Sequence, residues 1–103
     1  MPKGYVILTE AVHDEAGMQE YGKASAGALR EHGAKVLAVA PSDDIEVLEG
    51  TWHGTRTVVL EFASVEAAQT WYRSDAYQAA AKVRMAAADC NAVILPGFEF
   101  PGR

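Results

Sequence analysis

The most strongly β-like stretch of the chain is RTVVLEF, residues 56–62. Side chains alternate between the two faces of a strand. The two faces of this stretch carry Val58, Leu60 and Phe62 on one side and Thr57, Val59 and Glu61 on the other. A second stretch of the same kind is YVILTEAV, residues 5–12. Its faces carry Tyr5, Ile7 and Thr9 on one side and Val6 and Leu8 on the other. Both faces of both stretches are therefore apolar, which predicts strands that are covered on two sides.

Residues that cap helices separate these strands from the rest of the chain. Asp14 is a good N-cap for a first helix, and Gly33 supplies the left-handed residue that ends it. Ser64 and Ser74 can each cap a further helix. The last of these helices runs to about Ala88 and is rich in alanine, which gives it a high helix propensity.

Three further stretches are predicted to be strands: Lys35–Ala40, Ile45–Glu49 and Ala92–Leu95. A turn cluster at residues 41–44 joins the first two, and a loop at residues 50–55 leads into RTVVLEF. The order β-α-β-β-(α-α)-β matches the split βαβ motif with an extra strand or hairpin arm. We therefore predict the α+β class, with a ferredoxin-like antiparallel sheet in a single domain that spans residues 1–103.

The second apolar face of the sheet requires a cover that the chain does not supply. In a ferredoxin-like domain the helices pack on one face, so a monomer should present a polar second face. The simplest cover is a second copy that packs sheet to sheet around a two-fold axis. The sequence thus predicts a homodimer with a mass near 22 kDa, twice the 11.0 kDa of one chain.

Composition and charge exclude several classes of partner. Half of the 103 residues are apolar, and nine Lys and Arg against fourteen Asp and Glu give a net charge of −5. The basic residues are scattered without interleaved aromatic residues, so we expect no nucleic-acid binding. No apolar run is long enough to span a bilayer or to form a signal peptide, so we expect no membrane association. The single Cys90 cannot form an internal disulfide, which favours a reducing cytoplasm.

The sequence contains no motif for a metal or a large cofactor. His13, His32 and His53 have no partner four residues away on a helix, and Cys90 has no second thiol nearby. A nucleophile elbow, a phosphate-binding loop and a dinucleotide fingerprint are all absent from the sequence. We therefore expect neither a metal ion nor a cofactor.

Two polar aromatic residues lie on the core-facing stripe of the first helix, Tyr21 and His32. One interpretation is structural: a partly buried tyrosine, and a histidine that gains from the helix dipole at the C-terminal end. The other is functional: both side chains project into a cleft between helix and sheet, where His32 could transfer a proton near neutral pH.

Two charged residues belong to the stretch RTVVLEF. Arg56 opens it and Glu61 lies five residues on, so strict alternation turns the two side chains to opposite faces. Arg56 is either a charge at the strand edge or an anchor for a substrate carboxylate. Glu61 is either an interior carboxylate satisfied by a cross-strand partner or a base with a raised pKa.

Aromatic residues gather around the break between the second and third helices. Trp71 is predicted to belong to the core. Tyr77 and Arg84 lie two turns apart on one helix face, where Arg84 could stack on a ring, pair with an acid or bind a ligand. Trp52 and His53 lie in a loop, and loops carry function more often than packing, so these two are candidates for a pocket rim.

These residues also carry a resemblance to a known family. The matching positions are residues 46–50 (EVLEG), Trp52, Arg56, residues 58–62 (VVLEF), Ala67-Ala68, Trp71-Tyr72, Ser74, Tyr77-Gln78 and Arg84, with Gly4-Tyr5, Tyr21 and His32-Gly33 in the first half. In this combination the chain resembles the DUF1330 family over nearly its whole length. The resemblance implies a dimeric α/β barrel, in which two protomers pair their sheets. That superfamily includes small monooxygenases, isomerase-like proteins and haem-handling proteins, but DUF1330 itself has no settled activity, so the resemblance defines the fold and leaves the function open.

The sequence therefore predicts a site between the sheet and the helices that binds a small metabolite, aromatic or carboxylate-bearing. The candidate ligand-binding residues are Tyr21, His32, Trp52, Arg56, Trp71, Tyr77 and Arg84. His32 and Glu61 are the candidates for catalysis if the protein is a cofactor-free enzyme. The alternative is a non-catalytic interaction module, in which the interior polar groups only fix the register of the dimer.

Overall fold

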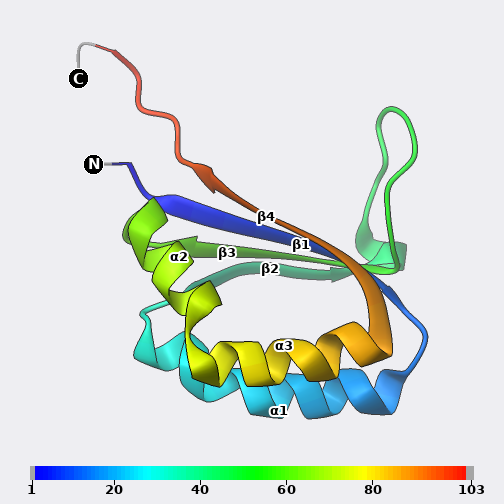
Figure 1. Cartoon of the computed structure of the whole chain (residues 1–103). Helices are drawn as coiled ribbons and strands as arrows, with labels where there is room; N and C mark the ends of the chain where they lie inside the picture. The colour runs from blue at the N-terminus through cyan, green and yellow to red at the C-terminus, as the bar shows by residue number, and fades with distance from the viewer. Residues whose placement is uncertain (1, 102–103) are drawn as a thin grey trace.

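The computed structural model of the chain describes residues 2–101, which form one sheet and three helices (Figure 1). In chain order the elements are β1 (Gly4–Val12), α1 (Glu15–Glu31), β2 (Lys35–Pro41), the short 3₁₀ helix η1 (Ser42–Asp44), β3 (Arg56–Phe62), α2 (Val65–Arg73), α3 (Asp75–Ala87) and β4 (Ala88–Pro96). Within these residues, no helix is both long enough and apolar enough to cross a membrane.

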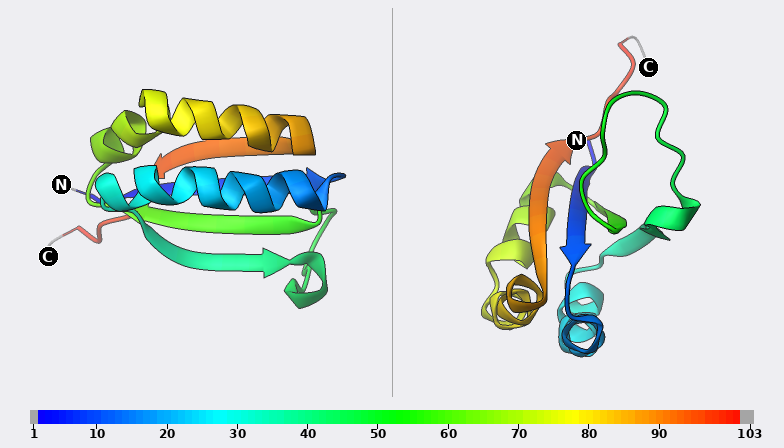
Figure 2. Two further views of the ribbon diagram at one scale, coloured as in Figure 1. Left: turned by 90° about the horizontal axis from the view of Figure 1, so that it is seen from below. Right: turned by 90° about the vertical axis from the view of Figure 1, so that its right-hand side faces the viewer.

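The sheet has the strand order β2-β3-β1-β4, and every neighbouring pair of strands is antiparallel. Helices α1 and α3 lie side by side against one face of it, and α2 packs near the end of β1 (Figures 1 and 2). The opposite face carries no helix (Figure 2). This is the ferredoxin-like α+β arrangement that the sequence predicts.

Local side-chain caps account for where the helices begin. Asp14 accepts a hydrogen bond from Gly17 N at 3.1 Å, and Ser64 accepts one from Ala67 N at 3.0 Å. Ser74 accepts from Tyr77 N at 3.2 Å and so separates α2 from α3. These bonds satisfy backbone donors that the first turn of a helix leaves free. All three predicted caps are confirmed.

The strand predicted at Ile45–Glu49 is wrong. A backbone hydrogen bond from Ser42 N to Thr55 O, 2.8 Å long, closes the β2–β3 connection and leaves residues 45–54 as a loop outside the sheet. Both edges of β3 are already occupied, by β1 and β2. The sheet has free edges only at β2 and β4, and residues 45–54 pair with neither of them.

The last strand is longer than predicted. It runs over Ala88–Pro96 and follows α3 directly, because Ala88 is both the C-cap residue of the helix and the first residue of the strand. Asp89 and Asn91 have low strand propensity, but residues 89–91 pair with residues 9–11 of β1. Cross-strand pairing outweighs the local preference here.

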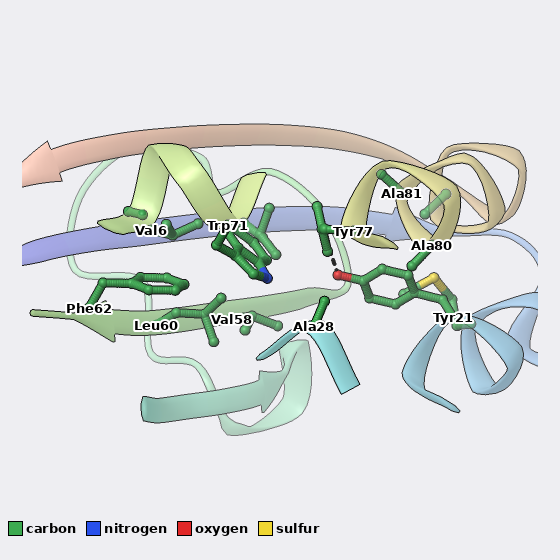
Figure 3. Packing of buried hydrophobic residues seen from close by; sticks show 14 of the residues in the cluster. Val6, Tyr21, Ala28, Val58, Leu60, Phe62, Trp71, Tyr77, Ala80 and Ala81 are labelled. Carbon is green, nitrogen blue, oxygen red and sulfur yellow. Dashed lines mark hydrogen bonds between the residues drawn. The ribbon is translucent and has the colours of Figure 1, made fainter. Parts of the chain in front are cut away.

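The core lies between the helices and the sheet and has an aromatic centre (Figure 3). Trp71 and Tyr77 are fully buried, and their ring centroids lie 4.1 Å apart. Phe62 packs on the other side of Trp71 at 5.2 Å. Val6 and Leu8 close the core from the sheet side. The prediction that Trp71 belongs to the core is confirmed.

The two faces of the central strands divide as the sequence predicts. Val6, Leu8, Val58, Leu60 and Phe62 face the helices and are buried. The face without helices, here called the open face, carries apolar side chains that remain partly exposed: Ile7, Val59, Val93 and Leu95. Of these, Val93 is 52% exposed and Leu95 is 38% exposed. Within the described residues, no helix covers the open face, and the β2–β3 loop contacts it at Thr9 and Thr57.

Gly54 and Gly27 should respond to alanine in opposite directions. Gly54 has a φ of +89°, and a Cβ there would lie 2.5 Å from the carbonyl oxygen of Glu10. We expect Gly54→Ala to lower the free energy of unfolding by about 2 kcal/mol or more. Gly27 lies within α1 with open space around it, so Gly27→Ala should raise that free energy by about 0.5–1 kcal/mol. Urea unfolding measures both, and a Gly54→Ala protein as stable as wild type would contradict the close approach to Glu10.

Candidate functional site

A small cavity of about 170 Å³ lies between α1 and strands β2 and β3. Its walls are mainly aliphatic, from Leu8, Leu29, Val36, Val39, Val58 and Leu60. Gly22, Ser25 and Ala26 face it from α1, and their small side chains leave the space open. Its polar aromatic and charged residues are Tyr21 and Arg56. We call it the α1–β3 cavity.

Arg56 is held in this wall by an ion pair with a carboxylate of the neighbouring strand. Its Nε lies 3.2 Å from Glu10 Oε1, and the two residues are cross-strand partners in β3 and β1. The Glu10 side chain has no exposed surface, whereas that of Arg56 is 34% exposed. The guanidinium therefore connects a buried carboxylate to the cavity.

Glu10 is the charged residue of this site that the sequence reasoning missed. It follows Val6 and Leu8 by two-residue steps, so strand alternation alone places it on the face that meets the helices. A carboxylate at such a position is expensive to bury and therefore needs a partner. The alternation of residues 5–12 shows this position, but most of the stretch is apolar and indicates only a buried strand.

The environment of Glu10 shifts the pKa of its carboxyl upward. Burial raises the pKa of this carboxyl, and the positive charges of Arg56 and Arg84 counteract part of the rise. Neither carboxylate oxygen makes a hydrogen bond within residues 2–101. The ion pair thus lacks the additional hydrogen bonds that usually accompany a buried charge.

Tyr21 joins the cavity to the aromatic core. Its hydroxyl lies 2.8 Å from that of Tyr77, within hydrogen-bond distance (Figure 3). Burial, together with Tyr77, raises the pKa of Tyr21, so its phenol stays neutral. The guanidinium carbon of Arg84 lies 5.8 Å from the centroid of the Tyr21 ring, which is within cation–π range.

The remaining predicted ligand-binding residues lie away from the cavity. Trp71 and Tyr77 are buried in the core, and Arg84 lines a different hollow, between α3 and β4. His32 is the C-cap residue of α1, and its Nε2 lies 3.4 Å from Glu31 Oε1. At a rise of 1.5 Å per residue, it lies about 16 Å along the helix from Tyr21. The structure thus brings Tyr21 and Arg56 together but not His32.

The β2–β3 loop meets the open face. Trp52 donates a hydrogen bond from Nε1 to Thr57 Oγ1 at 2.8 Å, and His53 Nδ1 lies 2.8 Å from Thr9 Oγ1. Both threonines belong to the face that the helices do not cover. Trp52 and His53 are therefore on the opposite side of the sheet from the cavity.

Glu61 also lies on the open face, opposite to Arg56 as predicted. Its carboxylate accepts hydrogen bonds from Tyr5 Oη at 3.0 Å and from Lys3 Nζ at 3.2 Å. These two donors lower the pKa of Glu61. These contacts favour the alternative of a carboxylate satisfied by a cross-strand partner over that of a base with a raised pKa.

These features define the class of the protein: a ferredoxin-like chain with an interior cavity and an open sheet face. Residues 3–98 match the family described as "Domain of unknown function (DUF1330)", and the chain belongs to that family. No curated protein matches the chain.

Solved structures share the fold at low sequence identity. RPA0582 of Rhodopseudomonas palustris, a protein of unknown function, is 21% identical, with a TM-score of 0.72 over 95% of this chain and 84% of that one. A dimeric ferredoxin-like protein of unknown function from Jannaschia sp. CCS1 is 18% identical, with a TM-score of 0.68 over 90% of this chain and 97% of that one. SnoaB of Streptomyces nogalater, a cofactor-independent oxygenase, is 8% identical, with a TM-score of 0.67 over 100% of both chains.

Replacing Glu10 should change how stability depends on pH. Burial raises the pKa of Glu10 above its ordinary value of 4.5, so the folded state binds this proton more tightly than the unfolded state. As the pH rises through that raised pKa, the free energy of unfolding of wild type should therefore fall relative to that of Glu10→Gln. Urea unfolding between about pH 4 and about pH 8 measures the difference.

Glu61→Gln provides a control of opposite sign. The hydrogen bond from Tyr5 and the ammonium of Lys3 lower the pKa of Glu61 below 4.5, so wild type should lose stability relative to Glu61→Gln as the pH falls through the lowered pKa. If Glu10→Gln and wild type kept a constant difference at every pH, the shifted pKa of Glu10 would be refuted.

Proposed function

We propose that the chain binds a small organic molecule, aromatic or carboxylate-bearing, in the α1–β3 cavity. The observation that carries the proposal is an apolar cavity with one guanidinium in its wall, that of Arg56. Ligand sites are typically apolar hollows with a few placed polar groups. An apolar wall supplies affinity, and a single charged group orients the ligand.

The volume of the cavity limits the size of the ligand. Cavities of about 150 Å³ lined by aliphatic and aromatic side chains accommodate a benzene molecule. The α1–β3 cavity, at about 170 Å³, has room for one ring with a small substituent. Tyr21 offers an aromatic edge or face to such a ring. Larger ligands would have to extend out past Val36 and Val39, which are 51% and 52% exposed.

Arg56 is suited to recognise a negatively charged substituent. A guanidinium carries five N–H donors in a planar fork. In Arg56 the Nε faces Glu10, and the partial exposure of the side chain leaves donors for a carboxylate or phenolate of a ligand. Of the other residues put forward by the sequence, Tyr77 contributes indirectly, through its hydroxyl contact with Tyr21.

The same cavity would also serve a cofactor-free enzyme. In that case Glu10, whose raised pKa suits a proton acceptor, is the group to consider next to Arg56. The shared fold of SnoaB, a cofactor-independent oxygenase, is compatible with this extension. The alternative is a non-catalytic module, in which the ion pair of Glu10 and Arg56 serves only to fix the strands.

We further propose that the chain forms a homodimer through the open face, giving a dimeric α/β barrel. The support is the exposed apolar set on that face, together with the dimeric ferredoxin-like protein of Jannaschia that shares the fold. A second copy would cover Val93 and Leu95, which no helix of the chain reaches. We place the dimer in the cytoplasm, since its one cysteine, Cys90, is a free thiol.

A ligand screen on two variants of α1 tests the cavity. We expect benzoate to raise the melting temperature of wild type with saturation, because a ligand that binds only the folded state stabilises it. Ala26→Leu fills the cavity and should abolish the rise, whereas Ala24→Leu, on the exposed side of the same helix, should preserve it.

Arg56→Gln should weaken benzoate about tenfold or more and leave toluene unchanged, because only benzoate has a charge for the guanidinium to bind. Calorimetric titration gives both affinities. If no one-ring compound bound, or if Ala26→Leu bound benzoate as wild type does, the cavity would not be the site, and the non-catalytic module would be favoured.

Light scattering with a charged substitution tests the dimer. Wild type should have a mass near 22 kDa, twice 11.0 kDa. Val93→Glu places a charge at an exposed position of the open face and should shift the mass toward 11.0 kDa while the circular dichroism spectrum stays unchanged. Ala24→Glu, on the exposed side of α1, is the matched control and should remain dimeric. A monomeric wild type at micromolar concentration would refute the proposal.

A further inference from the structure

A second hollow lies on the other side of the helix pair, between α3 and β4. It is an open groove of about 480 Å³, and its walls include Tyr72, Arg84, Met85, Asp89 and Cys90. It shares no lining residue with the α1–β3 cavity. We call it the α3–β4 groove. The proposal below does not depend on the α1–β3 cavity being a ligand site.

Arg84 is a buried cation with free donors at this groove. Arg84 is only 1% exposed, and its Nε and Nη2 make no hydrogen bond within residues 2–101. A buried charge without hydrogen-bonded partners costs several kcal/mol by order of magnitude, so buried guanidinium groups are normally paired. Arg84 therefore lacks the acceptor that its burial calls for.

The groups around Arg84 do not supply that acceptor. On the α1 side is the ring of Tyr21, 5.8 Å from the guanidinium carbon. Tyr77 and Cys90 also make side-chain hydrogen-bond interactions with Arg84, but neither residue is a carboxylate. Glu10 is the carboxylate that interacts electrostatically with Arg84, but it is already paired with Arg56 at 3.2 Å. Two guanidinium groups, those of Arg56 and Arg84, thus share one carboxylate.

The positions of the two free donors indicate the shape of the missing acceptor. Nε–H and Nη2–H lie on the same edge of a guanidinium and point in parallel, which is the edge that a carboxylate bridges with its two oxygens. Asp89 also lines the groove and repels any anion, and because this repulsion grows with the charge of the anion, a single carboxylate suits the groove better than a polyanion. We propose that the α3–β4 groove is a second binding site, which takes a small monocarboxylate on the Nε–Nη2 edge of Arg84.

Cys90 provides a reporter for this site. It lines the same groove, it is partly buried, and it is the single cysteine of the chain, so its alkylation by iodoacetamide can be counted by mass spectrometry of the intact protein. A carboxylate bound to Arg84 would obstruct access to its thiol. At constant ionic strength we expect acetate to slow the alkylation with saturation, and acetamide, its neutral isostere, to have no effect.

Four variants of the full chain define the outcome. Arg84→Gln should lose the protection by acetate, and Arg84→Lys, which keeps the charge but not the fork, should weaken it about tenfold or more. Arg73→Gln removes an exposed arginine of α2 that does not line the groove, and should retain full protection. Glu10→Gln removes the negative charge that partly offsets that of Arg84, so acetate should protect Cys90 at a lower concentration.

The proposal is overturned if acetate does not protect wild type, or if it protects Arg84→Gln equally. Where Arg84→Gln fails to fold by circular dichroism, Arg84→Lys decides: protection equal to that of wild type overturns the proposal. Ala26→Leu separates the two hollows, because it fills the α1–β3 cavity and should leave Cys90 protected by acetate. Loss of protection in that variant would place the anion in the cavity and refute a second site.

Discussion

The ion pair between Glu10 and Arg56 is the interaction on which the rest of the structure depends. Removing one partner of a buried pair costs about 3–5 kcal/mol, and the partial exposure of Arg56 places this pair toward the lower end. A slip of one residue between β1 and β3 would carry Arg56 to the open face and leave Glu10 unpaired. The pair thus fixes the register of the central strands. The backbone of Glu10 in turn anchors the long loop, since Thr55 N donates to the Glu10 carbonyl oxygen at 2.7 Å.

Contacts among Tyr21, Tyr77 and Arg84 divide the space between the helices and the sheet. Tyr21 forms part of the cavity wall, contacts Tyr77 of the core through its hydroxyl, and presents its ring to Arg84. This chain of contacts runs from α1 to α3 and separates the α1–β3 cavity from the α3–β4 groove. Each hollow has one arginine, and the one carboxylate between them is paired with Arg56. The arginine of the α1–β3 cavity is therefore paired with a carboxylate, whereas, within residues 2–101, that of the α3–β4 groove is not.

Local rules were sufficient for most of the fold. A cap such as Ser64 or Ser74 needs only one side chain and one N–H three residues on, so the sequence alone shows it. The bounds of β3 also follow from local composition, because residues 56–62 combine strand propensity with alternation. The segment Ile45–Glu49 has the same alternation and is not a strand. Alternation indicates that a segment can form a strand. Whether the segment pairs with another strand depends on where the β2–β3 connection places it.

The candidate site required information that the sequence does not contain. Alternation places Glu10 on the helix face, but its pairing with Arg56 depends on the register of two strands that are far apart in sequence. Likewise the helical stripe that includes Tyr21 also includes His32. Gly33 already places His32 at the helix end, but only the packing of α1 on the sheet shows that the cavity lies beside Tyr21. Solved structures with this fold, 8–21% identical to the chain, include both an oxygenase and proteins of unknown function. Because the fold is shared, the function of this chain has to be argued from its own side chains. The charged side chains in the layer between helices and sheet are Glu10, Arg56 and Arg84, and their arrangement is the property that any function assigned to the chain has to explain.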